Sequence, residues 1–310
     1  MDSSLRRGSL EMVAAMLISG TIGWFVLVSG QPVLEVVFWR CVFGTGTLLA
    51  ICAAFGFLKP GVITRTAFLL AIASGVAIVG NWVLLFASYS RASIAIGTAV
   101  YNVQPFMLVG LAALFLGEKI TAAKVTWLSV AFLGMLAIVS AHGAGQASGE
   151  DYLLGIALAL GAALLYAIAA LIIKRLKGTP PHLIALIQVA TGVLLLAPWV
   201  NLGGLPGQPS ALASLVTLGM VHTGLMYVLL YSAIQRLPTA LTGALSFIYP
   251  IAAILVDWVA FGHRLAPLQW LGVVLILLAA AGMQQGWWFR SAQVPAKGRM
   301  AAFSLACDPP

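Results

Sequence analysis

Charged residues are scarce in this chain. Only 8% of its 310 residues are Asp, Glu, Lys or Arg, whereas 62% are hydrophobic. A soluble domain carries roughly 25% charged residues, because its surface must face water. Here, runs of about 20 apolar residues recur along the whole length, and each is long enough to cross a hydrocarbon core of about 30 Å. The composition excludes an ordinary soluble domain and predicts a multi-pass protein whose main partner is the lipid bilayer.

Several functional motifs are also absent. The three cysteines, Cys41, Cys52 and Cys307, have neither metal-ligand spacing nor the pattern of a disulfide framework. No G-x-x-x-x-G-K-[ST] phosphate loop is present, so we expect no ATP binding or hydrolysis. No H-E-x-x-H motif or Cys/His cluster predicts a protease or a metal site, and no charged ring or carbonyl-filter motif predicts a channel. We therefore expect no cofactor, no metal and no enzymatic activity.

Clusters of charged residues, Pro and Gly divide the apolar sequence into ten segments. We expect helices over residues 10–29, 33–57, 66–88, 93–116, 121–141, 153–173, 182–202, 211–233, 238–261 and 266–289. The connections are short, and the tail 291–310 is expected to be a disordered cytoplasmic segment. The predicted fold class is an all-α integral membrane protein with ten transmembrane helices.

The basic residues predict the orientation of these helices. With the N-terminus in the cytoplasm, all 16 Lys and Arg residues except Arg40, Arg91 and Arg264 fall on the cytoplasmic side. Cytoplasmic loops are enriched in Lys and Arg, so both termini are predicted to be cytoplasmic. The net charge of +8 is then explained by helix orientation and anionic lipid headgroups, and we expect no nucleic-acid partner.

Two stretches, residues 86–120 and 231–265, match one another at an offset of 145 positions. The agreeing pairs are Arg91 with Arg236, Pro105 with Pro250, Gly117 with Gly262, and Lys119 with Arg264. Each half has five predicted spans, an odd number, so the second half enters the membrane in the opposite sense. We therefore expect two inverted five-helix repeats, residues 1–145 and 150–290, as is common in secondary transporters.

The matched stretches, "YNVQPFMLVGLAALFLGEKIT" and "SFIYPIAAILVDWVAFGHRL", resemble those of the drug/metabolite transporter superfamily. The likeness is to its ten-helix members with two EamA-type domains, and it covers about residues 8–289. The first half keeps the family's helix end in Gly117, Glu118 and Lys119, whereas His263 replaces the acid in the second half. The resemblance implies transport. Members with this layout export amino acids and related metabolites, and others move nucleotide sugars or phosphorylated sugars.

Polar and aromatic side chains inside the spans are the candidate substrate ligands. Arg40 is the only basic residue well inside a span, and a charge there normally faces a partner or a cavity. An inward aromatic cluster with a few polar groups would suit an amphipathic organic solute. The predicted substrate-binding residues are Arg40, Asn81, Trp82, Tyr101, Asn102, Tyr166 and Tyr249.

Two matched prolines interrupt the predicted helices. Pro105 and Pro250 lack an N–H, so each frees a carbonyl one turn earlier, and that carbonyl cannot face lipid. We predict that both prolines act as hinges on the substrate path, and a kink needed only for packing is the alternative. Asp257 lies at a depth similar to that of Arg40, which makes it the expected ion-pair partner or coupling residue. A structural and a substrate role for Arg40 both stay open.

These residues predict a secondary-active or facilitative transporter of the cell (inner) membrane. It is expected to export small organic metabolites by alternating access, as a monomer or homodimer, with amino acids as the first expectation. The alternative within transport is a carrier of drugs, nucleotide sugars or phosphorylated metabolites. The alternative from another class is an integral-membrane enzyme that modifies lipid.

Overall fold

The computed structural model describes residues 3–92, 97, 100–140, 150–202, 204–261, 267–285 and 287. This part of the chain is built from helices and contains no strand. The first-half helices are α1 (Ser3–Gly20), α2 (Ile22–Ser29), α3 (Val33–Ala54), α4 (Arg65–Ala92), α6 (Gln104–Leu116) and α7 (Ala122–Ser140). The second-half helices are α8 (Glu150–Arg175), α9 (Pro181–Leu196), η1 (Ala197–Trp199), α10 (Pro209–Gly219), η2 (Met220–Leu225), α11 (Met226–Arg236), α12 (Thr239–Ser246), α13 (Ile248–Phe261) and α14 (Pro267–Gln285).

Every predicted segment contains at least one helix, so the all-α prediction is confirmed for the described residues. Within the described ranges, six helical stretches are long and apolar enough to cross a membrane, and three apolar helices are shorter. The six are Ser3–Val26, Val33–Ala54, Arg65–Ser88, Asp151–Arg175, Pro181–Trp199 and Pro209–Arg236. The predicted tail 291–310 lies outside the described residues, as do the side chains of Pro250 and Asp257.

Two of the predicted segments are interrupted at places where no proline stands. Residues 10–29 form two helices that meet at Thr21, whose hydroxyl donates to the carbonyl of Ile18. A hydroxyl that bonds a nearby carbonyl competes with the helical ladder. Residues 211–233 keep a helical path but pass through η2, a π-helical segment.

A break in the helical backbone lies just before each of the two matched prolines. The chain turns at Asn102 and Val103 before α6, and it turns at Phe247 between α12 and α13. Asn102 and Phe247 are 145 positions apart, which is the offset of the sequence repeat. Pro105 then stands in the first turn of α6, where a missing N–H costs no helical bond.

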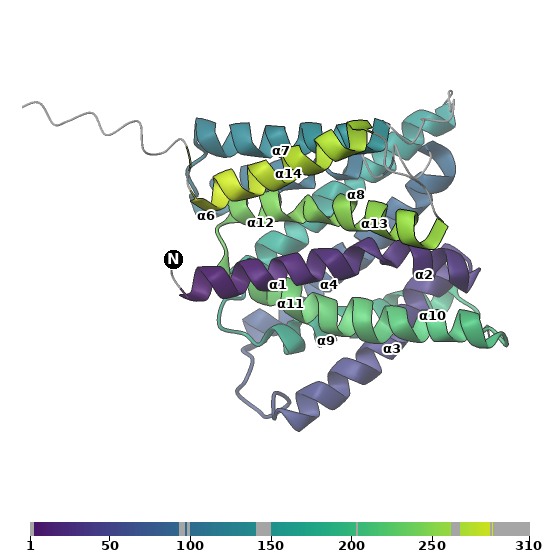
Figure 1. Cartoon of the computed structure of the whole chain (residues 1–310). Helices are drawn as coiled ribbons and strands as arrows, with labels where there is room; N and C mark the ends of the chain where they lie inside the picture. Colours follow the sequence, from purple (N-terminus) through teal and green to yellow (C-terminus); the bar gives the residue numbers. More distant parts are fainter. Residues whose placement is uncertain are drawn as a thin grey trace, which may run out of the picture.

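Several contacts between helices recur between their counterparts: where the two helices touch, the corresponding helices of the other half touch as well. In chain order, α1, α3, α4, α6 and α7 correspond to α8, α9, α10–α11, α12–α13 and α14. The α4–α8 contact has its counterpart in α1–α11, and α6–α8 has its counterpart in α1–α12 and α1–α13. Three further contacts join a helix to its own counterpart: α3–α9, α6–α12 and α7–α14. In Figure 1, α7 and α14 run side by side along one edge of the bundle. A two-fold relation between the halves would produce this pattern.

Candidate functional site

Arg40 lies deep inside the bundle on α3, with 1% of its surface exposed. Its Nε donates to Thr223 Oγ1 at 3.1 Å, and its Nη2 donates to the carbonyl of His222 at 3.4 Å. The guanidinium carbon lies 4.2 Å from the centroid of the Trp82 ring, a cation–π distance. All three contacts are with neutral groups. Within the described part of the chain, the ion pairs involve only the acids Glu11 and Glu118.

Within the described part of the chain, the neutral partners leave the positive charge of Arg40 uncompensated. Two unit charges 4 Å apart attract by about 4 kcal/mol at an effective dielectric constant of about 20, a term that a hydroxyl, a carbonyl or an aromatic ring does not supply. A carboxylate or phosphate on a bound solute would supply it, and a guanidinium can bond two of its oxygens at once. The surroundings of Arg40 therefore suit an anionic group better than a neutral one.

The π-helical segment η2 is what brings Thr223 and His222 against Arg40. Glycines allow α3 and η2 to touch through their backbones. A Cβ at Gly219 would lie 2.3 Å from Phe43 Cβ, and a Cβ at Gly44 would lie 2.8 Å from Thr223 Cγ2. A π turn shifts the helical register, and the Thr223 hydroxyl bonds the carbonyl of Leu218, five residues earlier. Such segments are frequent at functional sites.

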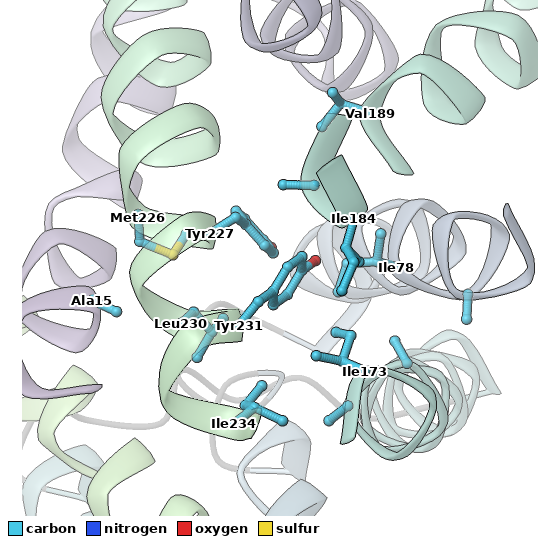
Figure 2. Packing of buried hydrophobic residues seen from close by; sticks show 14 of the residues in the cluster. Ala15, Ile78, Ile173, Ile184, Val189, Met226, Tyr227, Leu230, Tyr231 and Ile234 are labelled. Atoms are coloured by element: carbon cyan, nitrogen blue, oxygen red, sulfur yellow. The ribbon is translucent and has the colours of Figure 1, made fainter. Parts of the chain in front are cut away.

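A row of hydrogen-bonded aromatic and polar groups continues from Arg40 across four helices. Trp82 Nε1 on α4 donates to the Tyr227 hydroxyl on α11 at 3.0 Å, and the two rings meet edge-on. Tyr227 contacts Tyr231, whose hydroxyl donates to Gln188 on α9. Figure 2 shows Tyr231 reaching from α11 toward Ile184 and Ile78. Gln188 in turn donates to Ser74 on α4, the interhelical role expected for a buried amide.

The predicted ligands do not all lie in this row. Arg40 and Trp82 are in direct contact, whereas Tyr101 and Tyr166 form a separate edge-on pair with centroids 6.2 Å apart. Asn81 lies in the α4–α8 interface, where its Nδ2 donates to the Ala162 carbonyl at 2.7 Å. The remaining two lie at the helix breaks: Asn102 is buried in the turn before α6, and Tyr249 packs on the core from α13.

The break before α6 faces the bundle interior rather than lipid. Pro105 is buried, and a Cβ at Gly243 of α12 would lie 2.9 Å from Pro105 Cβ. Gln104, the first residue of α6, has a buried carbonyl oxygen Oε1 that finds no hydrogen-bond partner among the residues the structure describes. Pro105 therefore packs inside the bundle, and its role as a hinge stays a prediction. The side chains of Pro250, the second predicted hinge, and of Asp257, the predicted partner of Arg40, lie outside the described ones.

Sequence reasoning missed the second-half residues around Arg40 and Trp82. Thr223 and Tyr227 are not among the predicted ligands, although Gly219, just before the π segment, and Gly224, inside it, signal a close helix approach. His222 on η2 also lies against the first half. Its Nε2 lies within hydrogen-bond distance of Thr21 Oγ1, and its Nδ1 lies near the Thr217 carbonyl.

Comparison with known families gives a match over most of the chain. The model of the EamA-like transporter family matches twice, over residues 6–140 and 153–284. These two matched regions fall within the two predicted repeats. A solved crystal structure shares the fold, with a TM-score of 0.78, 19% sequence identity and alignment over 94% of this chain and 99% of the other.

Two relatives of similar length are described as transporters. An uncharacterized transporter of Bacillus subtilis, YxxF, is 31% identical over 276 residues, covering 88% of each chain. An uncharacterized transporter of Archaeoglobus fulgidus is 25% identical over 289 residues, which is 91% of this chain and 97% of the relative. Protein RarD of Escherichia coli is 25% identical over 201 residues, which is 63% of this chain and 61% of RarD.

Proposed function

Because this chain belongs to the EamA-like transporter family, we propose that it exports small organic metabolites, and amino acids in particular, by alternating access. The observation that carries the substrate class is Arg40, a buried cation whose described contacts are all neutral. An amino-acid carboxylate offers the missing negative charge, and the neighbouring Trp82 and Tyr227 offer apolar surface.

The transport cycle follows from the proposed architecture. Ten spans in two inverted five-helix repeats, with both termini in the cytoplasm of the cell (inner) membrane, would place the site between the halves. Arg40 and Trp82 belong to the first half, whereas Thr223, His222 and Tyr227 belong to the second. A movement of one half against the other would therefore rearrange the same contacts that hold the substrate. Drug and nucleotide-sugar carriers remain the alternative within transport.

The purified chain in liposomes tests the substrate class. Vesicles preloaded with an unlabelled amino acid are expected to accumulate the same labelled amino acid by exchange, faster than protein-free vesicles. Decarboxylated amines of the same side chain should not exchange, because they lack the anion for Arg40. Parallel vesicles loaded with a phosphorylated sugar or a nucleotide sugar test the alternative. Exchange of those solutes alone, or equal exchange of the amines, would refute the amino-acid proposal.

Pro105 is the proposed hinge residue whose surroundings the structure describes. We expect Pro105→Ala to slow amino-acid exchange several-fold, because an alanine N–H lets α6 extend toward Tyr101 and stiffens the break. Folded yield should stay close to that of wild type. Pro209→Ala is the matched control, since Pro209 is exposed and opens α10 after a loop. If Pro105→Ala exchanges at the wild-type rate, the proline serves packing alone.

A further inference from the structure

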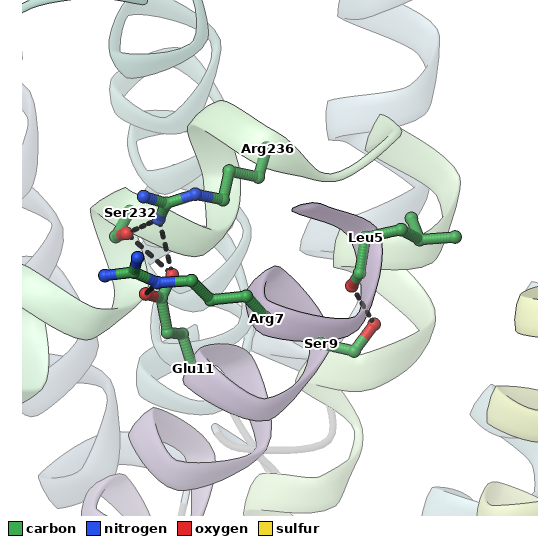
Figure 3. Close-up of polar contacts among 6 residues, drawn as sticks. All are labelled: Leu5, Arg7, Ser9, Glu11, Ser232 and Arg236. Atoms are coloured by element: carbon green, nitrogen blue, oxygen red, sulfur yellow. Dashed lines mark hydrogen bonds and ion pairs between the residues drawn. The ribbon is translucent and has the colours of Figure 1, made fainter. Parts of the chain in front are cut away.

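Glu11 ties the first helix of one half to a helix of the other half. It lies on α1, and its side chain is 12% exposed. Its Oε2 accepts from Arg236 Nη1 at 2.7 Å and from the Ser232 hydroxyl at 2.6 Å, both on α11, while Oε1 accepts from Arg7 Nε at 2.9 Å (Figure 3). One carboxylate on α1 therefore bonds two side chains of α11.

Glu118 makes a second tie of the same kind. It follows Gly117, whose left-handed backbone (φ +67°) ends α6. Its Oε1 accepts from the Thr239 hydroxyl at 2.6 Å and pairs with Lys174 Nζ at 3.3 Å. Thr239 opens α12 and Lys174 lies in the last turn of α8, so both partners belong to the second half.

Both ties lie at one end of the bundle, around the connection between α11 and α12. Lys174 Nζ also donates to the carbonyl of Leu237, the residue after Arg236. The opposite end has a different contact between the halves, in which Glu35 at the start of α3 accepts from the backbone N–H of Asn201 at 2.9 Å. The carboxylates thus hold the halves together at both ends. We call the end that contains Lys174 and Arg236 the basic end. Among the described residues, ion pairs between the halves occur at this end only.

We propose that Glu11 and Glu118 are positioning residues of the transport cycle, whose ties between the halves close the basic end and must separate whenever the substrate site opens there. The inference rests on the alternating-access part of the proposed function, since only a moving pair of halves has to break such ties. Partly buried pairs of this kind bias an equilibrium by about fivefold each, which is enough to set how long the end stays closed without locking it.

A cysteine placed deeper in the bundle than the Glu11 and Glu118 contacts becomes accessible to a labelling reagent when this end opens. Thr242 lies one turn further into α12 than Thr239 and is 3% exposed. In a chain with Cys41, Cys52 and Cys307 replaced by Ala, Thr242→Cys is reconstituted in nanodiscs and treated with a maleimide. Rates are normalised to those of the unfolded chain at the same pH. We expect Glu118→Gln and Glu11→Gln each to speed labelling about fivefold.

Control variants separate gating from general loosening. Glu118→Asp, which keeps the charge, should return labelling toward the rate of the reporter chain with Glu118 intact. The charge exchange Glu118→Lys with Lys174→Glu should do the same. Glu35→Gln, at the opposite end, should not speed labelling of this cysteine. Equal acceleration by Glu35→Gln, or no acceleration by either basic-end variant, would overturn the proposal. Because labelling needs no substrate, a failed amino-acid assay leaves this test intact.

The Glu118 tie is expected to persist over the physiological pH range. Burial raises the pKa of Glu118, but the Thr239 hydrogen bond and the positive charges of Lys174 and Lys124 outweigh it, so its pKa lies below the ordinary value of 4.5. A lowered folded pKa means that the stabilisation is complete above the unfolded pKa and is lost only as pH falls through the folded one. The labelling ratio of Glu118→Gln to the intact reporter chain should therefore be equal at pH 7 and pH 5. A ratio that falls toward one at pH 5 would contradict this.

Discussion

Replacing Arg40 with Met is expected to lower amino-acid exchange by about 10- to 150-fold, the cost of losing hydrogen bonds to a charged group. The same change should leave the unfolding temperature in detergent unchanged or raised. A buried cation with neutral partners costs free energy in the empty protein, and an apolar side chain of similar volume often removes that cost. Reduced transport in an equally stable protein would identify Arg40 as a substrate ligand.

Two further variants make this result interpretable. Arg40→Lys keeps the charge but loses the planar fork, so we expect partial activity. Arg91→Met is the matched control, because the exposed Arg91 side chain bonds only the Ala87 carbonyl of its own helix among its described contacts. It should leave exchange unchanged. A large loss of stability in Arg40→Met would instead show that Arg40 is structural, and Asp257→Asn should then be comparably unstable if Asp257 is its partner.

The architecture was largely predictable because the bilayer restricts it so strongly. A span must be about 20 apolar residues long and must satisfy its own backbone, so segments such as 33–57 and 153–173 could be read from length and composition. Their helices run over Val33–Ala54 and Glu150–Arg175. The 145-position offset also predicted the position of both helix breaks, because proline lacks the backbone N–H that a helix interior needs and can be read directly from the sequence.

The irregular segments could not be read in this way. The break at Thr21 and the π turn over Met220–Leu225 contain no proline. They depend on what approaches from another helix: His222 lies against Thr21, and α3 lies against Gly219. Such contacts are set by the rotation of each helix about its axis, and hydropathy carries almost no signal for that rotation when most faces are apolar.

The candidate site was predictable to the same partial degree. The burial of Arg40 followed from the cost of a charge in lipid. Its contact with Trp82 was not foreseen, although both residues were selected, because depth along a span does not give the facing direction. Tyr227 and Thr223 were overlooked because a Tyr or Thr in a span is more often a packing residue, and only the fold shows that Thr223 bonds the guanidinium and that Tyr227 bonds Trp82.

Among the described glycines, Gly219 is the one whose replacement with Ala is expected to be most damaging. The added Cβ would meet Phe43 Cβ at 2.3 Å, the Gly44 nitrogen at 2.9 Å and the Arg40 carbonyl at 3.1 Å. Two of these neighbours are backbone atoms and cannot rotate away. Overpacking costs about 1–3 kcal/mol or more, so the unfolding temperature in detergent should fall clearly.

Gly110→Ala provides the control for this result. Gly110 lies within α6, and a Cβ there would meet no atom within 4 Å, so the change should stabilise the helix by up to about 1 kcal/mol. Gly219→Ala should also move η2 away from α3 and so weaken the bonds from Arg40 to Thr223 and His222. Its transport is then expected to fall further than its folded fraction does. If exchange per folded molecule stays at the wild-type level, the close approach of α3 and η2 serves packing, and the geometry around Arg40 does not depend on it.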